Sequence, residues 1–122
     1  MKTHLFLLMT FISFLFLIQS CNNNEPTPST VLNLTLKSDA SYQYDLGYFG
    51  DEEGATISIP PKHFKDSKID RDINSGKVIY TYAPSTGFTG TDTVELKSMR
   101  GSDGASANDN ITIVVIKFKI ID

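Results

Sequence analysis

The sequence predicts an all-β protein, an antiparallel sandwich of about seven strands preceded by a cleaved signal peptide and a flexible tether. Two observations predict the sandwich. Apolar and polar residues alternate in several short runs at the two-residue period of a strand. Glycine, proline, asparagine and aspartate separate these runs, and no segment of useful length shows helical periodicity. The signal peptide and the tether follow from the composition of the first 30 residues.

Residues 1–20 have the organisation of a secretory signal. Lys2 supplies a positive charge, and residues 5–18 form an almost unbroken apolar run, shorter than the roughly 20 residues that a spanning helix needs. The run ends in Ile18-Gln19-Ser20-Cys21, which resembles the bacterial lipobox, whose cysteine is acylated and becomes the new N-terminus. Cys21 is the chain's single cysteine, so this resemblance implies a lipid attachment point. The alternative is ordinary signal cleavage that leaves a free thiol.

Residues 22–30 contain two prolines and no large apolar residue, which is typical of a flexible tether. Extended at about 3.3 Å per residue, this segment would hold a domain up to roughly 30 Å from the membrane. The predicted organisation is therefore a lipoprotein signal peptide over 1–20, a lipid-anchored tether over 21–30 and one sandwich domain over 31–122. The expected location is the cell envelope, as an outer-membrane lipoprotein that faces the periplasm or the cell surface.

The predicted strands are short and are justified by alternation between turn signals. They cover residues 31–36, 42–46, 55–59, 67–73, 78–83, 92–99 and 110–121. The last strand combines two apolar parities, because Ile111 and Ile113 lie opposite in phase to the apolar series that begins at Val114. Either a bulge shifts its register, or the second face is covered at one end.

The stretch from Tyr80 to Val94 predicts a strand, a corner and a second strand. A set of six residues in it matches the pattern Tyr-x-Pro-x-x-Gly-Phe-x-Gly-x-Asp: Tyr82, Pro84, Gly87, Phe88, Gly90 and Asp92. The proline removes a ladder donor, the glycines permit positive φ, and the aspartate accepts hydrogen bonds from turn amides. This corner resembles that of the bacterial immunoglobulin-like and cadherin-like repeats of Bacteroidota-like surface proteins. The resemblance implies an immunoglobulin-like fold.

The composition is poor in catalytic groups. After the signal peptide the chain has one histidine, His63, and no Gly-x-Ser-x-Gly elbow, so we predict that it is not an enzyme. The chain from Cys21 onward holds ten basic and fourteen acidic residues, a formal charge of −4. This balance argues against a nucleic-acid partner.

Acidic residues gather in two of the predicted loops. Because consecutive strands alternate direction, the loops after the second, fourth and sixth strands should emerge at the same end of the sandwich. The carboxylates in these loops are Asp51, Glu52, Glu53, Asp103 and Asp109. Calcium takes six to eight oxygen ligands, so they are candidates for a calcium site; the favoured interpretation is solvated acidic loops with no metal or cofactor.

These observations predict a non-enzymatic, lipid-anchored envelope protein whose domain binds a protein partner or serves as a small subunit of a surface assembly. One alternative is a glycan-binding module, for which a tyrosine would have to be solvent-exposed on a flat face. The same-face pairs Tyr42 with Tyr44 and Tyr80 with Tyr82 are expected to fill the core instead of forming a platform for sugars. The other alternative is a calcium-dependent adhesion domain.

Overall fold

A computed structural model describes residues 29–101, 104–105 and 109–122 of the chain. The predicted signal peptide, Cys21, most of the tether and Asp103 lie outside these described residues. Across the described ranges, no helix is long and apolar enough to cross a membrane.

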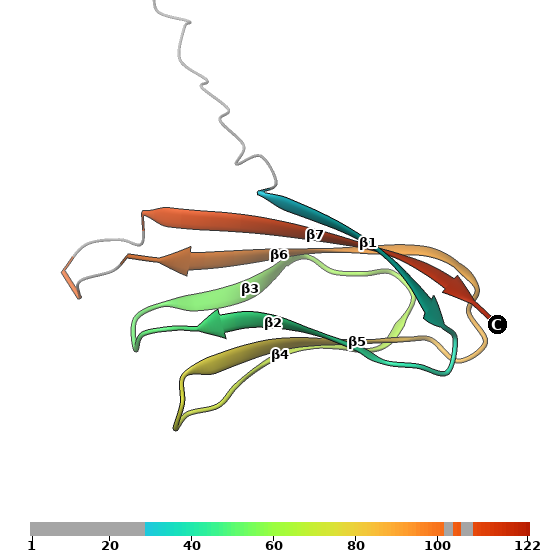
Figure 1. The fold of residues 1–122 in the computed structure, drawn as a ribbon, viewed down its shortest axis with the longest axis horizontal. Coiled ribbons are helices and arrows are strands. Elements are labelled where there is room, and N and C mark those ends of the chain that lie inside the picture. The colour runs from blue at the N-terminus through green and yellow to red at the C-terminus, as the bar shows by residue number, and fades with distance from the viewer. Residues whose placement is uncertain (1–28, 102–103, 106–108) are drawn as a thin grey trace, which may run out of the picture.

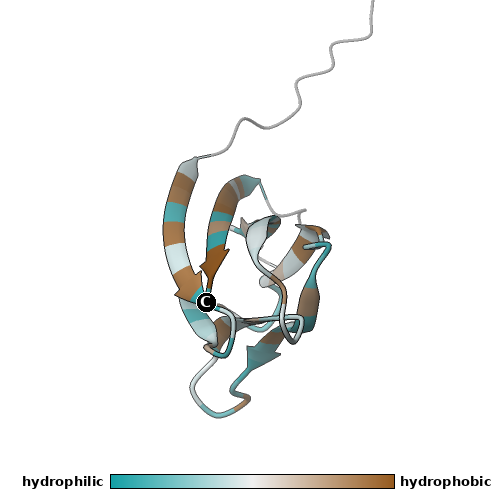
Figure 2. Ribbon diagram, turned by 90° about the vertical axis from the view of Figure 1, so that its right-hand side faces the viewer, coloured by the Kyte–Doolittle hydropathy of each residue, from teal (hydrophilic) through white to brown (hydrophobic). Residues whose placement is uncertain are grey.

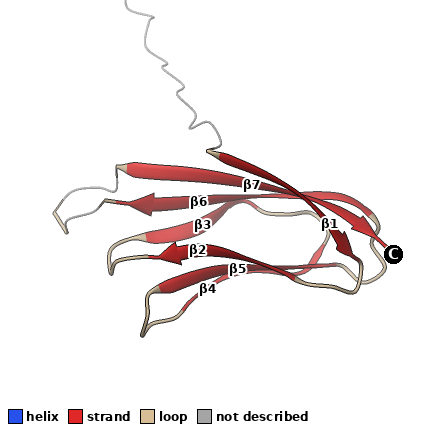
Figure 3. Ribbon diagram, in the orientation of Figure 1, coloured by secondary structure: helices blue, strands red, loops and turns tan. Residues whose placement is uncertain are grey.

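The described chain folds into seven strands in two sheets, as predicted (Figures 1 and 3). One sheet has four strands in the order β1-β7-β6-β3, and the other has three in the order β2-β5-β4. The strands are β1 (Thr30–Lys37), β2 (Tyr42–Tyr48), β3 (Gly54–Ile59), β4 (Phe64–Arg71), β5 (Lys77–Pro84), β6 (Gly90–Arg100) and β7 (Asn110–Ile121).

The strand order is that of an immunoglobulin-like sandwich. Strands β2, β5 and β4 correspond to the B-E-D strands, and β3, β6 and β7 correspond to the C-F-G strands. Four of the strand pairs are antiparallel, but β1 pairs with β7 in parallel. The fold class is therefore confirmed, with one parallel pair that the expectation of antiparallel pairing missed.

The core lies between the two sheets, and its fully buried part is filled by alternate residues of three strands, β5, β6 and β7. The buried cluster consists of Tyr80, Tyr82, Val94, Leu96, Val114, Ile116, Phe118 and Ile120. The Tyr82 ring stacks on Phe118 with 4.1 Å between centroids, and Tyr42 meets the same phenylalanine edge-on at 5.7 Å. Aromatic pairs in such contact contribute beyond the area that they bury.

The two apolar parities of β7 do not arise from a bulge. The register between β6 and β7 is unbroken from Gly90 paired with Ile120 to Arg100 paired with Asn110. Ile113 is buried, and Ile111 on the same face is 41% exposed. The second face is therefore covered at one position and open at another.

The fourth strand begins three residues earlier than predicted and ends two residues earlier. It runs over Phe64–Arg71, whereas alternation suggested 67–73. Ile73, which favoured the later end, lies in the following turn and is 91% exposed. The early start reflects pairing of Phe64 with Pro84 on β5, a contact between distant residues.

Candidate functional site

The corner aspartate is a buried acceptor for four hydrogen bonds. Asp92 is 5% exposed. Its Oδ1 accepts the backbone amides of Lys62 at 2.8 Å and Thr93 at 3.0 Å. Its Oδ2 accepts the backbone amide of His63 at 2.8 Å and the Tyr82 hydroxyl at 3.1 Å. The carboxylate therefore ties the link between β3 and β4 to the corner between β5 and β6.

The other corner residues complete this structural unit. Phe88 is half-buried against the core, and its ring stacks on the His63 imidazole with 4.2 Å between centroids. Pro84 is buried at the end of β5, and Gly87 has φ = 74° in the turn that follows. Burial and the neighbouring Asp92 charge raise the pKa of Tyr82 well above its usual value. The corner residues are thus engaged with one another, which leaves little polar chemistry for a ligand.

At the opposite end, the described parts of the loops after β2, β4 and β6 lie at the same end of the sandwich, as expected (Figure 1). The Glu53 carboxylate accepts the amide of Gly50 at 2.8 Å and the amide of Gly101, beyond β6, at 2.9 Å. These two hydrogen bonds hold the pKa of Glu53 below its usual value. Arg71 donates to the carbonyls of Phe49, Gly50 and Glu53 at 3.0, 2.8 and 3.1 Å.

The calcium candidates do not assemble into a site within the described ranges. There, no three His, Cys, Asp or Glu side chains come together in a group that could hold a metal ion. Glu53 uses both carboxylate oxygens to join two loops. Asp51, Glu52 and Asp109 lie in the described parts of the loops, and Asp103 lies outside them.

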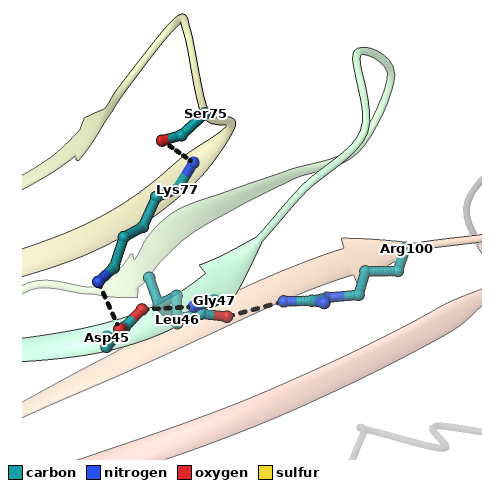
Figure 4. A network of polar contacts seen from close by, with 6 residues as sticks. All are labelled: Asp45, Leu46, Gly47, Ser75, Lys77 and Arg100. Carbon is teal, nitrogen blue, oxygen red and sulfur yellow. Dashed lines mark hydrogen bonds and ion pairs between the residues drawn. The ribbon is translucent and has the colours of Figure 1, made fainter.

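A bulge in β2 is fixed across the two sheets (Figure 4). The register with β5 shifts between Asp45 and Gly47, and the Leu46 carbonyl accepts the Arg100 guanidinium of β6 at 2.7 Å. Asp45 accepts the Gly47 amide at 2.9 Å and forms an ion pair with Lys77 at 3.0 Å. The Arg100 guanidinium carbon also lies 3.9 Å from the centroid of the Phe49 ring, so its charge is engaged in a cation–π contact at this end of the domain.

Asp92, Glu53, Arg71 and Arg100 at the two ends therefore form hydrogen bonds within the domain, and the remaining candidate surface is the outer side of the four-stranded sheet. We call this surface the outer face and define it by residues that share one side of the strands. On β1 and β3 they are Val31, Asn33, Thr35, Lys37, Thr56 and Ile59; on β6 and β7 they are Thr91, Thr93, Glu95, Lys97, Met99, Ile111, Ile113, Val115, Lys117 and Lys119.

One half of the outer face holds its apolar residues, together with Glu95 and Lys97. The register places Ile59, Glu95, Val115 and Val31 in one row across all four strands. Val31 is 49% exposed and Ile59 is 55% exposed. Ile111, near the start of β7, is the third exposed apolar residue of this half. Figure 2 shows the alternating hydrophobic and hydrophilic bands along β1 and β7, as expected for strands with one side toward the core. Exposed apolar groups that share a face, bordered by polar residues, are typical of an interaction surface.

The other half of the outer face is basic and hydroxylated. Lys117 lies between Thr93 and Asn33, and Lys119 lies between Thr91 and Thr35. These residues line a shallow groove of about 510 Å³. The face carries four lysines against one carboxylate, Glu95, whose Oε1 accepts the Ser58 hydroxyl at 2.6 Å.

Charge is distributed unequally between the two sheets. Within the described residues the lysines of the outer face form no ion pair, and both ion pairs lie on the three-stranded sheet. They join Lys68 to Asp70 and Lys77 to Asp45. The outer face is therefore locally positive on a chain whose overall charge is negative.

Sequence reasoning did not identify the outer face as a site. Its signal was the second apolar parity of β7, which continues from Ile111 and Ile113 into Lys117 and Lys119. The sequence alone does not show which residues of β1, β3 and β6 lie next to these β7 residues, so the surface is defined only by the strand register.

The tyrosine pairs do not form an exposed platform. Tyr80 and Tyr82 are fully buried, and Tyr42 and Tyr44 are half-buried against the core. Burial raises the pKa of Tyr80 to about 12, although its hydroxyl lies 3.0 Å from that of Ser67. Among the five tyrosines, Tyr48 at the end of β2 is the exposed one, at 63%. The prediction that both pairs contribute to the core is confirmed.

Comparisons with known proteins give a structural likeness and no family. No family model matches the chain, and no curated protein matches it. A solved structure of the cysteine protease inhibitor EhICP2 from Entamoeba histolytica is similar, with 13% sequence identity and a TM-score of 0.48. The similarity covers 77% of this chain and 99% of that one.

Proposed function

We propose that the chain is a non-enzymatic, lipid-anchored protein of the cell envelope whose immunoglobulin-like domain binds a protein partner through the outer face of its four-stranded sheet. Cys21 would carry the lipid, and the segment before β1 would connect it to the domain. The observation that supports this binding surface is that one sheet face combines exposed apolar residues with lysines that form no ion pair within the described part of the chain.

Two features support a protein as the partner. The apolar half of the outer face, with Val31, Ile59 and Ile111 each between 41% and 55% exposed, offers area whose burial would drive association. The basic half would orient an acidic counterpart, because complementary charge sets the specificity and the rate of encounter. The groove on the basic half is shallow and continuous with the exposed apolar residues of the other half, and an extended surface of this kind suits a protein better than a small molecule, which is usually held in a deeper concave pocket.

The polar residues that could have carried chemistry support a non-enzymatic role. His63 is the one histidine after the signal peptide, and its imidazole stacks on Phe88. The acidic group nearest to it in the corner, Asp92, is buried and already accepts four hydrogen bonds. A catalytic pair would need a base that is free to exchange a proton with a bound substrate.

The test is affinity capture from an envelope extract of the native host. The bait is the chain from residue 21 with Cys21→Ser, beside the acylated form, so that recognition by the domain is separated from insertion of the lipid. Two variants of this bait are compared, Lys117→Glu with Lys119→Glu on the outer face and Lys65→Glu with Lys68→Glu on the three-stranded sheet. Both variants change the charge equally, and all four lysines are exposed.

We expect one defined protein to be recovered by the parent bait and by the control variant, Lys65→Glu with Lys68→Glu on β4. Its recovery should fall by about tenfold or more with the outer-face variant, because two attractive charges become repulsive at the contact. Equal recovery by both variants would contradict the assignment of the surface. Enrichment of polysaccharide alone would instead favour the glycan-binding alternative, for which exposed Tyr48 would be the first residue to replace.

A further inference from the structure

We propose that the outer edge of β1 pairs with the same edge of a second copy of this chain, antiparallel about a two-fold axis at Leu34. Pairing of this kind would join two four-stranded sheets into one continuous sheet. It concerns the free edge of β1, whose exposed side chains Asn33 and Thr35 also belong to the outer face, and it does not depend on the function proposed above.

The sandwich has four edge strands, and three of them are protected against pairing. Strands β1 and β3 are the edges of one sheet, and β2 and β4 are the edges of the other. The register of β2 is interrupted between Asp45 and Gly47, and that of β3 between Ile57 and Ile59. Strand β4 is protected by charge at Lys65, Asp66, Lys68, Asp70 and Arg71. Bulges and edge charges are the devices by which proteins prevent strands from adding to their sheets.

Strand β1 has none of these devices. Its eight residues pair with β7 in an unbroken register from Thr30 to Lys37. It contains no proline, and its single charged residue, Lys37, is the last one. Within the described chain its other side has no strand partner, so a row of backbone amides and carbonyls remains available.

The sequence of β1 is complementary to itself in the antiparallel direction. Leu32, Leu34 and Leu36 are half-buried and face the core, whereas Asn33 and Thr35 between them are exposed. Pairing about Leu34 places Leu32 opposite Leu36 of the second copy and Leu34 opposite its counterpart. The three half-buried leucines would thus extend the core across the junction.

On the exposed side the same register is also compatible. Asn33 lies opposite Thr35 of the second copy, and Lys37 lies opposite Val31, so no like charges face each other. Residues directly opposite in an antiparallel pair have Cβ atoms about 5 Å apart, which is close enough for their chemistry to decide the register.

The symmetry has a structural consequence. A two-fold axis at Leu34 perpendicular to the sheet turns the outer faces of both copies in the same direction. A partner with two matching sites would then be held by two faces at once, which raises its overall affinity. A single added strand buries little area, so we infer a reversible dimer at micromolar concentration.

The test is sedimentation velocity over a concentration series of the chain from residue 21 with Cys21→Ser. Two variants carry like charges at the exposed positions of β1, Asn33→Glu with Thr35→Glu and Asn33→Lys with Thr35→Lys. We expect a dimer for the parent and a dissociation constant about tenfold or more higher for each variant alone, because like charges then face each other twice. An equimolar mixture of the two variants should dimerise again, because every facing pair then has opposite charges.

Circular dichroism of each variant establishes that it is folded, and Lys65→Glu with Lys68→Glu on the protected edge serves as the control that should leave the dimer unchanged. A parent chain that stays monomeric throughout the series would overturn the proposal. Dimers that persist unchanged in both variants would overturn the assignment to β1. A mixture of folded variants that stays monomeric would overturn the register about Leu34.

Discussion

Replacement of Asp92 by alanine is expected to lower the free energy of unfolding by about 3 to 5 kcal/mol. The substitution removes the acceptor for the amides of Lys62, His63 and Thr93 from a site where Asp92 is 5% exposed. The Tyr82 hydroxyl retains only the His63 carbonyl oxygen, at 3.3 Å. A buried donor that loses its acceptor retains the full cost of its desolvation. Because the chain has no tryptophan, urea unfolding is best followed by circular dichroism.

The matched control is Tyr82→Phe, which removes one of these donors and keeps the ring that stacks on Phe118. We expect it to cost about 1 kcal/mol alone and measurably less in the Asp92→Ala background, because the two groups share a hydrogen bond. An Asp92→Ala variant within 1 kcal/mol of the parent would contradict a structural role for the corner carboxylate.

Replacement of Gly76 by alanine is expected to cost about 3 kcal/mol, the second largest effect. Gly76 has φ = 71°, and a Cβ there would lie 2.7 Å from the Phe49 carbonyl oxygen. That oxygen cannot move freely, because it accepts Arg71, and the Phe49 amide donates to the Gly76 carbonyl at 3.0 Å. The substitution therefore adds a steric clash to the cost of a left-handed conformation.

Gly87 provides the comparison for this prediction. Its φ of 74° is nearly the same, but a Cβ at Gly87 would meet no atom within 4 Å. Gly87→Ala should therefore cost only the conformational term, about 1 kcal/mol. Thermal and urea unfolding of both variants measure the difference in their free energies of unfolding. Equal losses of stability would contradict the prediction, because they would show that the Phe49 carbonyl moves away from the added Cβ at no cost.

The strands could be predicted from the sequence because alternation and turn residues are local signals. The seven predicted runs all correspond to strands, and the last is matched at both ends. Strand β4 was displaced because its charged residues give little alternation, and its start depends on pairing with Pro84. The parallel pairing of β1 with β7 likewise depends on residues about 84 positions apart, for which no local pattern exists.

The candidate sites were predictable to a smaller extent. Asp92 was expected to accept turn amides, but two of its donors, Lys62 and His63, lie 30 and 29 residues earlier in the chain. Glu53 was considered as a calcium ligand, and the structure uses it to join two loops. In both cases the residue type indicated an acceptor, and only the packing of distant segments identified the donor.

The central claim is that the outer face of the four-stranded sheet contacts a protein partner. Its most direct test is photo-crosslinking in the native host, with a benzophenone amino acid at position 117 on this face or at position 68 on the three-stranded sheet. We predict an adduct between this chain and a different protein from position 117 and none from position 68. An adduct from position 68 alone, or none from position 117, would contradict the claim.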